Sequence, residues 1–432
     1  APLHPAIKHV IYIIKENRTY DQVLGDLPQG NGDPSLVLFG RDVTPNLHAL
    51  AERFVLLDNF YDCAEVSADG WNWSTSGMVS EYAARNVHFN YSGRGRNYDF
   101  EGENNGTPVD LIGLPDVNRA PGGYIWDAVA KKGLSYRGYG FFTAFADSKD
   151  ANGKMIAKTN EPNRKALVGH TDVDYLKFDM DYADSDAWKL HNCPETVKKP
   201  TYGQYGAPSR FAEWKREFDG FIKNGSLPAF SMVRLPRDHT SATRPGSASP
   251  RAMVADNDYA VGQLVEAVSS SPYWKDTAIF ILEDDAQDGY DHVDAHRSIC
   301  FVISPYIRRG MVDHHFYNTD SVLHSMEWLL GVPAMNQYDA GAPLLVAFGA
   351  GAENNEPYKA ILPERQIVAE VNGETAYRAK DSQNLDFSCA DRISCGIMND
   401  ILWHSVKGVE RSAPIIHRNI KRPVASNDVE NR

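Results

Sequence analysis

The sequence predicts a three-layer α/β/α sandwich with a mostly parallel central sheet and polar insertions. Short, β-rich apolar segments alternate with helical patterns along much of the chain, and this alternation is typical of a parallel sheet covered on both faces. Polar side chains follow directly after several of these segments, where such sheets bind ligands. A chain of 432 residues, 42% of them hydrophobic, can form one large domain with insertions or two to three smaller domains.

The expected elements follow one another in order. Residues 7–14, IKHVIYII, form an apolar run typical of a buried parallel strand. Thr44 and Pro45 then predict a helix to Arg53, with Thr44 as the N-cap and Pro45 at the first helical position. Further strands are expected at 54–61, 136–142, 229–235, 277–282 and 299–307, and further helices at 73–84, 125–132, 208–223, 253–268 and 321–330.

The remaining segments divide the chain into a domain and an extension. We expect one large domain over residues 1–352. Insertions are expected at about 86–121 and 145–205, because these two stretches are polar and rich in Gly, Asn, Asp and Pro. Residues 353–432 lack the regular alternation and are expected to be a C-terminal extension packed on the core. Six aspartates lie within 172–186 and predict either a solvated loop or a calcium site.

Composition excludes several classes of partner. The net charge is −13, which argues against binding to nucleic acid or to an anionic membrane surface. An anionic substrate remains possible, because a bound metal reverses the local sign of charge. A run of about 18 apolar residues is absent from the sequence, so we expect no stable membrane insertion.

Two features bear on the compartment. The chain begins at Ala1 with no n-region or h-region, which we interpret as the mature form of an exported protein, periplasmic or secreted by a bacterium. The five cysteines form no CxxC metal motif. Cys389 and Cys395 are six residues apart and can form a local disulfide, as an oxidising compartment would allow; free thiols are the alternative.

Polar clusters at the predicted strand ends define a candidate site. They are Glu16 and Asn17; Ser67; Asp238 and His239; Glu283, Asp284 and Asp285; and His292 and His296 just before the last strand. The strand ends meet in one crevice, so these groups are expected to converge. Their oxygen-rich set suits a hard or borderline divalent cation: Mg²⁺, Ca²⁺, Mn²⁺, or Zn²⁺ with mixed ligands. A serine on such an ion loses its proton more easily and becomes a nucleophile.

Each cluster also has an ordinary structural explanation. Adjacent acids at a strand end are often simply solvated, and Glu16 with Asn17 could form a capped turn. Asp238 with His239 could be a surface turn, and His296 a paired core histidine. His292 follows a Gly-Tyr-Asp turn and could only fix that loop.

Several longer motifs point to a known family. Residues 7–25, IKHVIYIIKENRTYDQVLG, resemble the opening of the bacterial phosphoesterase family that contains phospholipases C and acid phosphatases. Residues 285–293, DAQDGYDHV, and the segment from 317 to 333 resemble later motifs of that family. The nearest resemblance, carried by residues 58–73 and 283–297, is to phosphoesterase domains found fused to β-propellers.

The resemblance implies an alkaline-phosphatase-like fold and a metal-bound hydroxyl nucleophile. It implies metal ligands at Glu16, Asn17, Ser67, Asp284 and Asp285, while Asp238, with His239 and His296, could hold a second ion. Ser67 would be the nucleophile, and His239 and His296 would bind phosphate, a second metal or the leaving group. Asn17, Asn72 and His292 are the expected substrate contacts.

The chain departs from the family pattern at two positions. Relatives carry Thr-Phe-Pro-Asn where this chain has Ser67-Ala68-Asp69-Gly70, so Asn72 is expected to replace the missing phosphate contact. Relatives with two zinc ions carry an Asp-His pair where this chain has Asp284-Asp285, which favours a single ion.

The function expected from the sequence is hydrolysis of a small phosphate ester through a phosphoserine. A phosphomonoesterase is the first expectation, and a phosphodiesterase or phospholipase C is the alternative. Phospho- or sulfo-transfer to another acceptor uses the same metal geometry and is a further possibility. A catalytically inactive secreted binding protein is the alternative of another class, since fold does not imply function. The sequence leaves the oligomeric state open.

Overall fold

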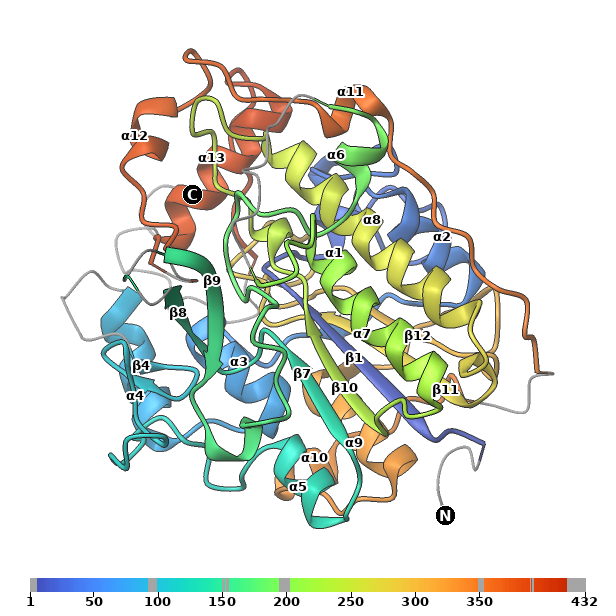
Figure 1. The fold of residues 1–432 in the computed structure, drawn as a ribbon. Helices are drawn as coiled ribbons and strands as arrows, with labels where there is room; N and C mark the ends of the chain where they lie inside the picture. The colour runs from blue at the N-terminus through green and yellow to red at the C-terminus, as the bar shows by residue number, and fades with distance from the viewer. Residues whose placement is uncertain are drawn as a thin grey trace, which may run out of the picture.

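A computed structural model describes residues 6–91, 99–149, 152, 155–193, 203–348, 353–388, 390 and 392–417 (Figure 1). Cys389 lies outside these residues, so the structure does not describe its pairing with Cys395. In the part of the chain that is described, no helix combines the length and apolar character needed to cross a bilayer.

A five-stranded sheet forms the centre of the molecule, with the strand order β12-β11-β1-β10-β7. Its strands are β1 (His9–Lys15), β7 (Tyr136–Tyr139), β10 (Phe230–Arg234), β11 (Thr277–Glu283) and β12 (Cys300–Ile303). All neighbouring strands are parallel except β12, which pairs antiparallel with β11 at the edge. The register places Lys15 opposite Glu283 and Ile14 opposite Arg234, so β1, β10 and β11 end together. The predicted mostly parallel sheet is confirmed.

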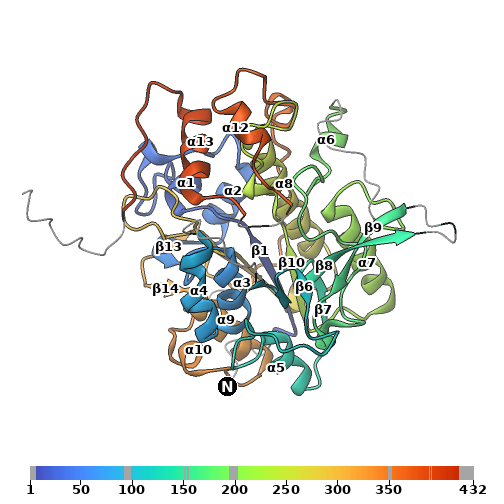
Figure 2. The same ribbon diagram turned by 90° about the vertical axis from the view of Figure 1, so that its left-hand side faces the viewer.

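Helices cover both faces of this sheet (Figures 1 and 2). On one face α8 packs against α2 and α7, and on the other α9 packs against β1, α3, α5 and α10. The larger helices are α2 (Pro45–Arg53), α3 (Ser67–Ser76), α4 (Glu81–Tyr91), α5 (Ile125–Lys131), α7 (Arg210–Asn224), α8 (Pro250–Ser269), α9 (Thr319–Leu330) and α13 (Cys395–Lys407). Shorter ones are α1 (Tyr20–Leu24), α6 (Ala187–Leu190), α10 (Gln337–Gly341), α11 (Arg365–Val368) and α12 (Ala379–Gln383).

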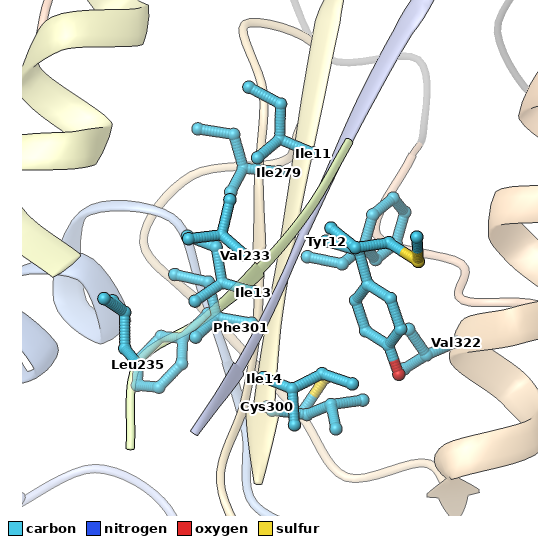
Figure 3. Packing of buried hydrophobic residues seen from close by; sticks show 14 of the residues in the cluster. Ile11, Tyr12, Ile13, Ile14, Val233, Leu235, Ile279, Cys300, Phe301 and Val322 are labelled. Atoms are coloured by element: carbon cyan, nitrogen blue, oxygen red, sulfur yellow. The ribbon is translucent and has the colours of Figure 1, made fainter. Parts of the chain in front are cut away.

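The central strand β1 is buried on both faces, which explains its continuous apolar sequence. Ile11 and Ile13 point to one face, while Tyr12 points to the other, toward Val322 of α9 (Figure 3). The Tyr12 hydroxyl donates a 2.9 Å hydrogen bond to the carbonyl oxygen of Ser74 in α3. Burial of each apolar side chain of this kind contributes about 1.5–3 kcal/mol to stability.

Two local predictions were wrong, and a third was confirmed with one difference. The segment 54–61 is not a strand of the central sheet but splits into β2 (Val55–Leu57) and β3 (Phe60–Tyr61), which pair with β13 (Met311–Asp313) and β14 (Tyr317–Asn318). The helix expected at 73–84 is two helices, because α3 ends at Gly77, whose φ of 64° is left-handed. The helix from Pro45 to Arg53 is confirmed, with Thr44 at the N-cap position, but the Thr44 side chain makes no cap hydrogen bond. Instead, the Asp258 carboxylate of α8 accepts from the N–H groups of Asn46 and Leu47.

The polar insertions carry small β structures of their own. The first contains the sheet β4-β5-β6 (Asp99–Phe100, Glu103–Asn104 and Thr107–Pro108), and the second contains most of the hairpin β8-β9 (Thr143–Lys149 and Met155–Pro162). The aspartate-rich segment is not a solvated loop, because Asp172, Asp174 and Asp184 are buried. Arg210 donates to Asp184 over 2.8 Å, and Arg216 pairs with Asp172. Internal ion pairs therefore replace solvation here.

The described residues beyond 353 pack on the sandwich. Leu402 and Trp403 of α13 join a buried cluster with Val254 of α8 and Tyr290. Met398 and Ile401, on the same helix, pack near Ala242. This C-terminal segment thus covers the region just beyond the end of β10.

Candidate metal and phosphate site

Ser67 is the first residue of α3 and is completely buried. The helix starts there because the Asp69 carboxylate accepts a 3.1 Å hydrogen bond from the N–H of Val66, the residue before it. Gly70 then allows the first turn to lie directly on the end of β11. A Cβ atom at Gly70 would lie 2.6 Å from the carbonyl oxygen of Asp284, so no other residue fits without a shift.

Four of the predicted side chains meet at this helix start. The Ser67 hydroxyl donates to Asp285 Oδ2 over 2.9 Å and lies 3.4 Å from the side-chain amide of Asn17. With its amide nitrogen turned toward the acids, Asn17 donates to Asp284 Oδ1 over 3.0 Å and to Asp285 Oδ2 over 3.1 Å. The structure therefore brings together Asn17, Ser67, Asp284 and Asp285, from the ends of β1 and β11 and the start of α3.

The backbone of Asn17 is adapted to this position. Its φ of 75° lies in the left-handed region, which asparagine tolerates better than most residues. Such a conformation costs on the order of 1 kcal/mol and persists where the surroundings hold it. Here it directs the side chain that follows β1 toward the acids of β11.

The donor set fits a divalent cation. Asp284 and Asp285 are adjacent and fully buried, and two such carboxylates repel each other in a low-dielectric interior. Ser67 is a further oxygen donor, and Asn17 becomes one when its side chain is turned so that the oxygen rather than the nitrogen faces the acids. A set of this kind prefers Mg²⁺, Ca²⁺ or Mn²⁺, with Zn²⁺ accepted in mixed sets. A cation among these four side chains removes the repulsion and can bind the hydroxyl of Ser67.

Glu16 lies beside this cluster but has an additional partner. Its Oε1 accepts from Arg234, with Nε at 2.7 Å and Nη2 at 2.6 Å. Arg234 in turn lies over the ring of Trp71 in α3, 4.0 Å from the ring centroid, and pairs with Glu101 over 2.9 Å. A bond from Glu16 to a metal would therefore have to come from Oε2.

Asp238 has a different position from the one expected of a metal ligand. Its Oδ2 accepts from Lys15 Nζ over 2.7 Å, and its Oδ1 accepts from the backbone N–H of Glu16 over 3.0 Å. Lys15 also donates to Glu283 over 2.9 Å, and all three side chains are buried. Burial alone would lower the pKa of Lys15, but the two carboxylates outweigh it and raise that pKa. This arrangement favours a structural role for Asp238, joining the ends of β1, β10 and β11.

His239 is buried next to Asp238 and is neutral at ordinary pH. Its Nδ1 lies 2.9 Å from the carbonyl oxygen of Thr240, which fixes the proton on Nδ1 and leaves Nε2 as an acceptor. Burial lowers the pKa of His239 to about 4, and the nearby Arg18 adds to the effect. In this neutral form Nε2 can accept a proton, bind a metal ion or accept a hydrogen bond from a protonated phosphate oxygen. It has no proton to donate.

His296 has the opposite electrostatic environment. Its Nε2 lies 3.3 Å from the carboxylate of Glu65, two residues before Ser67, and its Nδ1 lies 2.8 Å from Asp294. The hydrogen bond to Glu65, helped by Asp294 and opposed by burial, raises the pKa of His296 to about 9. His296 is therefore protonated at neutral pH and can donate a proton.

The two remaining candidates differ in their surroundings. His292 is fixed by Asp21 at 2.6 Å and by Asn31 at 3.2 Å, within a separate network centred on Arg297. This environment favours the loop-fixing role for His292. Asn72 lies in α3 and accepts from the Tyr124 hydroxyl over 3.0 Å, while its buried Nδ2 makes no hydrogen bond to any residue that the structure describes. That nitrogen remains available to a ligand oxygen.

Sequence reasoning missed the cations of the site. Lys15 and Arg234 are both buried, at the ends of β1 and β10, and each pairs with two acids. Lys15 and Arg234 could have been predicted as site residues, because each is a charged residue at the end of an otherwise apolar strand. Glu101 carried no such signal, because it comes from a polar insertion.

Comparison with known proteins identifies the family. The family model described as "Phosphoesterase family" matches residues 29–333. No curated protein is significantly similar to the chain. Similar solved structures include the phosphonate monoester hydrolase of Agrobacterium radiobacter, at 14% identity and a TM-score of 0.47, covering 79% of this chain and 77% of that one.

Two further structures show the same degree of similarity. A protein in the alkaline phosphatase superfamily from Vibrio parahaemolyticus has 17% identity and a TM-score of 0.45, covering 80% of this chain and 72% of that one. The lipoteichoic acid synthase LtaP from Listeria monocytogenes has 12% identity and a TM-score of 0.41, covering 93% and 92%. The family assignment rests on the sequence match, which extends over more than half of the chain: the protein belongs to the phosphoesterase family and is a hydrolase acting on ester bonds.

Proposed function

We propose that the protein is a metal-dependent phosphomonoesterase with Ser67 as its nucleophile. The observation that carries the proposal is the 2.9 Å hydrogen bond from the Ser67 hydroxyl to Asp285 within a buried cluster that also holds Asn17 and Asp284. In this cluster the hydroxyl already faces the group that can take its proton. A metal held by Asn17, Ser67, Asp284 and Asp285, with Oε2 of Glu16, would lower the pKa of the hydroxyl and offset phosphate charge.

The protein's own groups account for the transfer. The Ser67 oxygen forms a bond to phosphorus while the bond from phosphorus to the alcohol oxygen breaks, giving a phosphoserine. Water then attacks phosphorus and releases Ser67 and inorganic phosphate. The N-terminus of α3 supports both steps, because the helix dipole favours an anion at Ser67, its first residue. Asn72 Nδ2 is the further donor proposed for a phosphate oxygen.

Proton donation to the leaving alcohol is assigned to His296 rather than His239. The pKa of His296 is raised to about 9 by Glu65, so the ring carries a proton at neutral pH. The pKa of His239 is lowered to about 4 by burial, so that ring is neutral. The carboxylate of Glu65, two residues before Ser67 in the sequence, holds the His296 ring.

The proposal is tested by hydrolysis of p-nitrophenyl phosphate and bis-p-nitrophenyl phosphate from pH 5 to 10. Rates are measured before and after chelation, with Mg²⁺, Ca²⁺, Mn²⁺ and Zn²⁺ restored one at a time. We expect turnover of the monoester that chelation abolishes. The kcat for the monoester should be lower by at least about 10³-fold in Ser67→Ala. Ser76→Ala, at the other end of α3, is the matched control and should keep its rate.

The other outcomes separate the alternatives. Preference for the diester would replace the phosphomonoesterase with a phosphodiesterase or phospholipase C. A Ser67→Ala variant with a near-normal rate would overturn the nucleophile assignment. A folded wild-type protein that turns over neither ester with any ion would contradict the phosphomonoesterase proposal.

A further inference from the structure

The described residues enclose a cavity of about 500 Å³ with a partly aromatic lining. Phe178 and Met180 form its buried floor, each with 2% of its surface exposed. Phe145 of β8 and Phe387, from the segment between α12 and α13, also line it. Three phenylalanines from three distant parts of the chain therefore face one space, which is large enough for a small organic group.

The imidazole of His239, one of the predicted site residues, packs against the aromatic wall of this cavity. Its ring makes edge contacts with Phe178, with the centroids 5.5 Å apart, and with Phe387, with the centroids 6.2 Å apart. Phe178 also lies 5.7 Å from the guanidinium of Arg234, which holds Glu16. The aromatic cavity is thus linked through Phe178 and Arg234 to Glu16, the residue before Asn17.

The charges around the cavity do not favour a highly charged occupant. Arg244 is paired with Asp181 over 2.6 Å, and Lys158 and Asp179 are the other charged residues of the lining within the described part of the chain. Two cations and two acids give this lining no excess of either sign. A polyphosphate or a second phosphate group would gain little here, whereas an uncharged ring can pack on the phenylalanines.

We propose that this cavity binds an aromatic ring carried by the alcohol of the substrate, so that the preferred substrates are aromatic phosphate monoesters. The inference rests on the proposed function, because it takes the phosphate to bind beside Ser67. The phosphate then lies on the acid and serine side of His239, and the ring lies on the phenylalanine side. Phe387 makes the C-terminal segment a part of the substrate site.

Binding of phosphonates tests the inference without turnover. Benzylphosphonate, cyclohexylmethylphosphonate and ethylphosphonate are titrated into the full-length protein by calorimetry, with each of the four divalent ions present in turn. Benzylphosphonate should bind at least about tenfold more tightly than ethylphosphonate, since it buries a ring. It should also bind about threefold or more tighter than the cyclohexylmethyl compound, because ring–ring contacts add to burial.

Two variants locate the effect. In Phe387→Ala the ratio of the dissociation constants of cyclohexylmethylphosphonate and benzylphosphonate should fall to about one. Phe211→Ala removes a phenylalanine from α7 that lines a different cavity, and the preference should stay as in the wild type. Equal affinity for benzyl and cyclohexylmethyl phosphonates, or an unchanged preference in Phe387→Ala, would overturn the inference. So would a wild-type protein that binds none of the three phosphonates.

Turnover separates this inference from the proposed function. The same preference should be present in kcat/KM for benzyl phosphate and cyclohexylmethyl phosphate, whose leaving alcohols are similar in size. If both are hydrolysed at equal kcat/KM and the activity requires Ser67, the phosphomonoesterase stands and the aromatic site does not. If neither ester nor p-nitrophenyl phosphate is hydrolysed but the phosphonate preference is observed, the ring site stands and the phosphomonoesterase does not.

Discussion

Lys15 Nζ lies 2.7 Å from Asp238 Oδ2, and neither side chain is more than 1% exposed. Glu283 is the other partner of Lys15, so one ammonium lies between two buried carboxylates at the ends of the central strands. This ion cluster lies at the ends of the central strands, and it therefore connects the stability of the sheet to the position of the residues that follow each strand.

Replacing Lys15 should be strongly destabilising. Lys15→Met leaves Asp238 and Glu283 buried without their cation, which typically costs about 3–5 kcal/mol. The free energy of unfolding from urea titration measures the loss. Lys8→Met is the control, because Lys8 pairs with Asp276 at the surface and is 69% exposed, so its loss should cost less than about 1 kcal/mol. Equal costs for the two variants would contradict the structural role of the Lys15 cluster.

Gly70 should be intolerant even of alanine. A Cβ atom there would lie 2.6 Å from the Asp284 carbonyl oxygen, so Gly70→Ala must push α3 away from β11. Overpacking of this kind costs about 1–3 kcal/mol, and a displaced Ser67 should lower kcat by an order of magnitude or more. Urea titration and steady-state kinetics measure the two effects.

A second glycine provides the comparison. Gly220 lies within α7, and an added Cβ atom there would meet nothing within 4 Å. Gly220→Ala should therefore stabilise the protein by about 0.5–1 kcal/mol and leave kcat unchanged. If Gly70→Ala behaves like Gly220→Ala, the close packing of α3 on β11 does not position the nucleophile.

His296 should control the alkaline limb of the pH–rate profile. Its pKa of about 9 keeps the ring protonated at neutral pH, and activity should fall as the pH rises through that value. His296→Gln should lose this limb and lower kcat by about 10²-fold for benzyl phosphate. The loss should be smaller for p-nitrophenyl phosphate, whose leaving group departs without a proton.

A structural role for His296 would give a different pattern. In that case both substrates would lose the same factor, and the alkaline limb would persist. His314→Gln is the matched control, since His314 is 72% exposed and pairs with Asp58 in a similar ion pair. It should change neither the profile nor the ratio of the two rates.

A pair of buried acids should make stability depend on pH. Glu327 of α9 and Asp339 of α10 both accept from the backbone N–H of Met335, at 3.2 and 2.9 Å. Burial, and then the charge of Asp339, raise the pKa of Glu327 to about 9. Because the folded-state pKa is the higher one, this contribution to stability is full below about pH 4.5 and is lost as the pH rises toward 9.

Glu327→Gln should remove that dependence. The amide keeps the shape of the side chain and carries no charge, so the variant should be more stable than the wild type at pH 8 by about 1–3 kcal/mol. At pH 4.5 the two proteins should differ little. Thermal unfolding midpoints across this range measure the effect, and a wild-type advantage at pH 8 would show that Glu327 is ionised without strain.

The sequence predicted the parts of the site that depend on the sheet. Asn17, Ser67, Asp284 and Asp285 could be brought together in advance because parallel strands end at one edge, and the family resemblance indicated which polar residues to place there. The helix of Ser67 was expected to begin later, because its first turn holds small and polar residues and shows no apolar period.

Other parts depend on contacts that no local pattern records. His292 belongs to a motif close to the site residues in sequence, yet Asp21 and Arg297 hold it in a separate network. The aromatic cavity is formed by Phe145 and Phe387, which come from an insertion and from the C-terminal segment. Because these segments have no regular pattern of apolar residues, the sequence does not predict which of their side chains contact each other.

The bond between Tyr12 and Ser74 has a consequence for heat inactivation. This hydrogen bond ties the last part of α3 to the central strand β1, and Gly70 lets the first turn of α3 pack closely against the end of β11. A helix held at two points against the core cannot slide or loosen alone. Loss of activity on heating should therefore coincide with melting of the whole sandwich, with no inactive yet folded state at lower temperature.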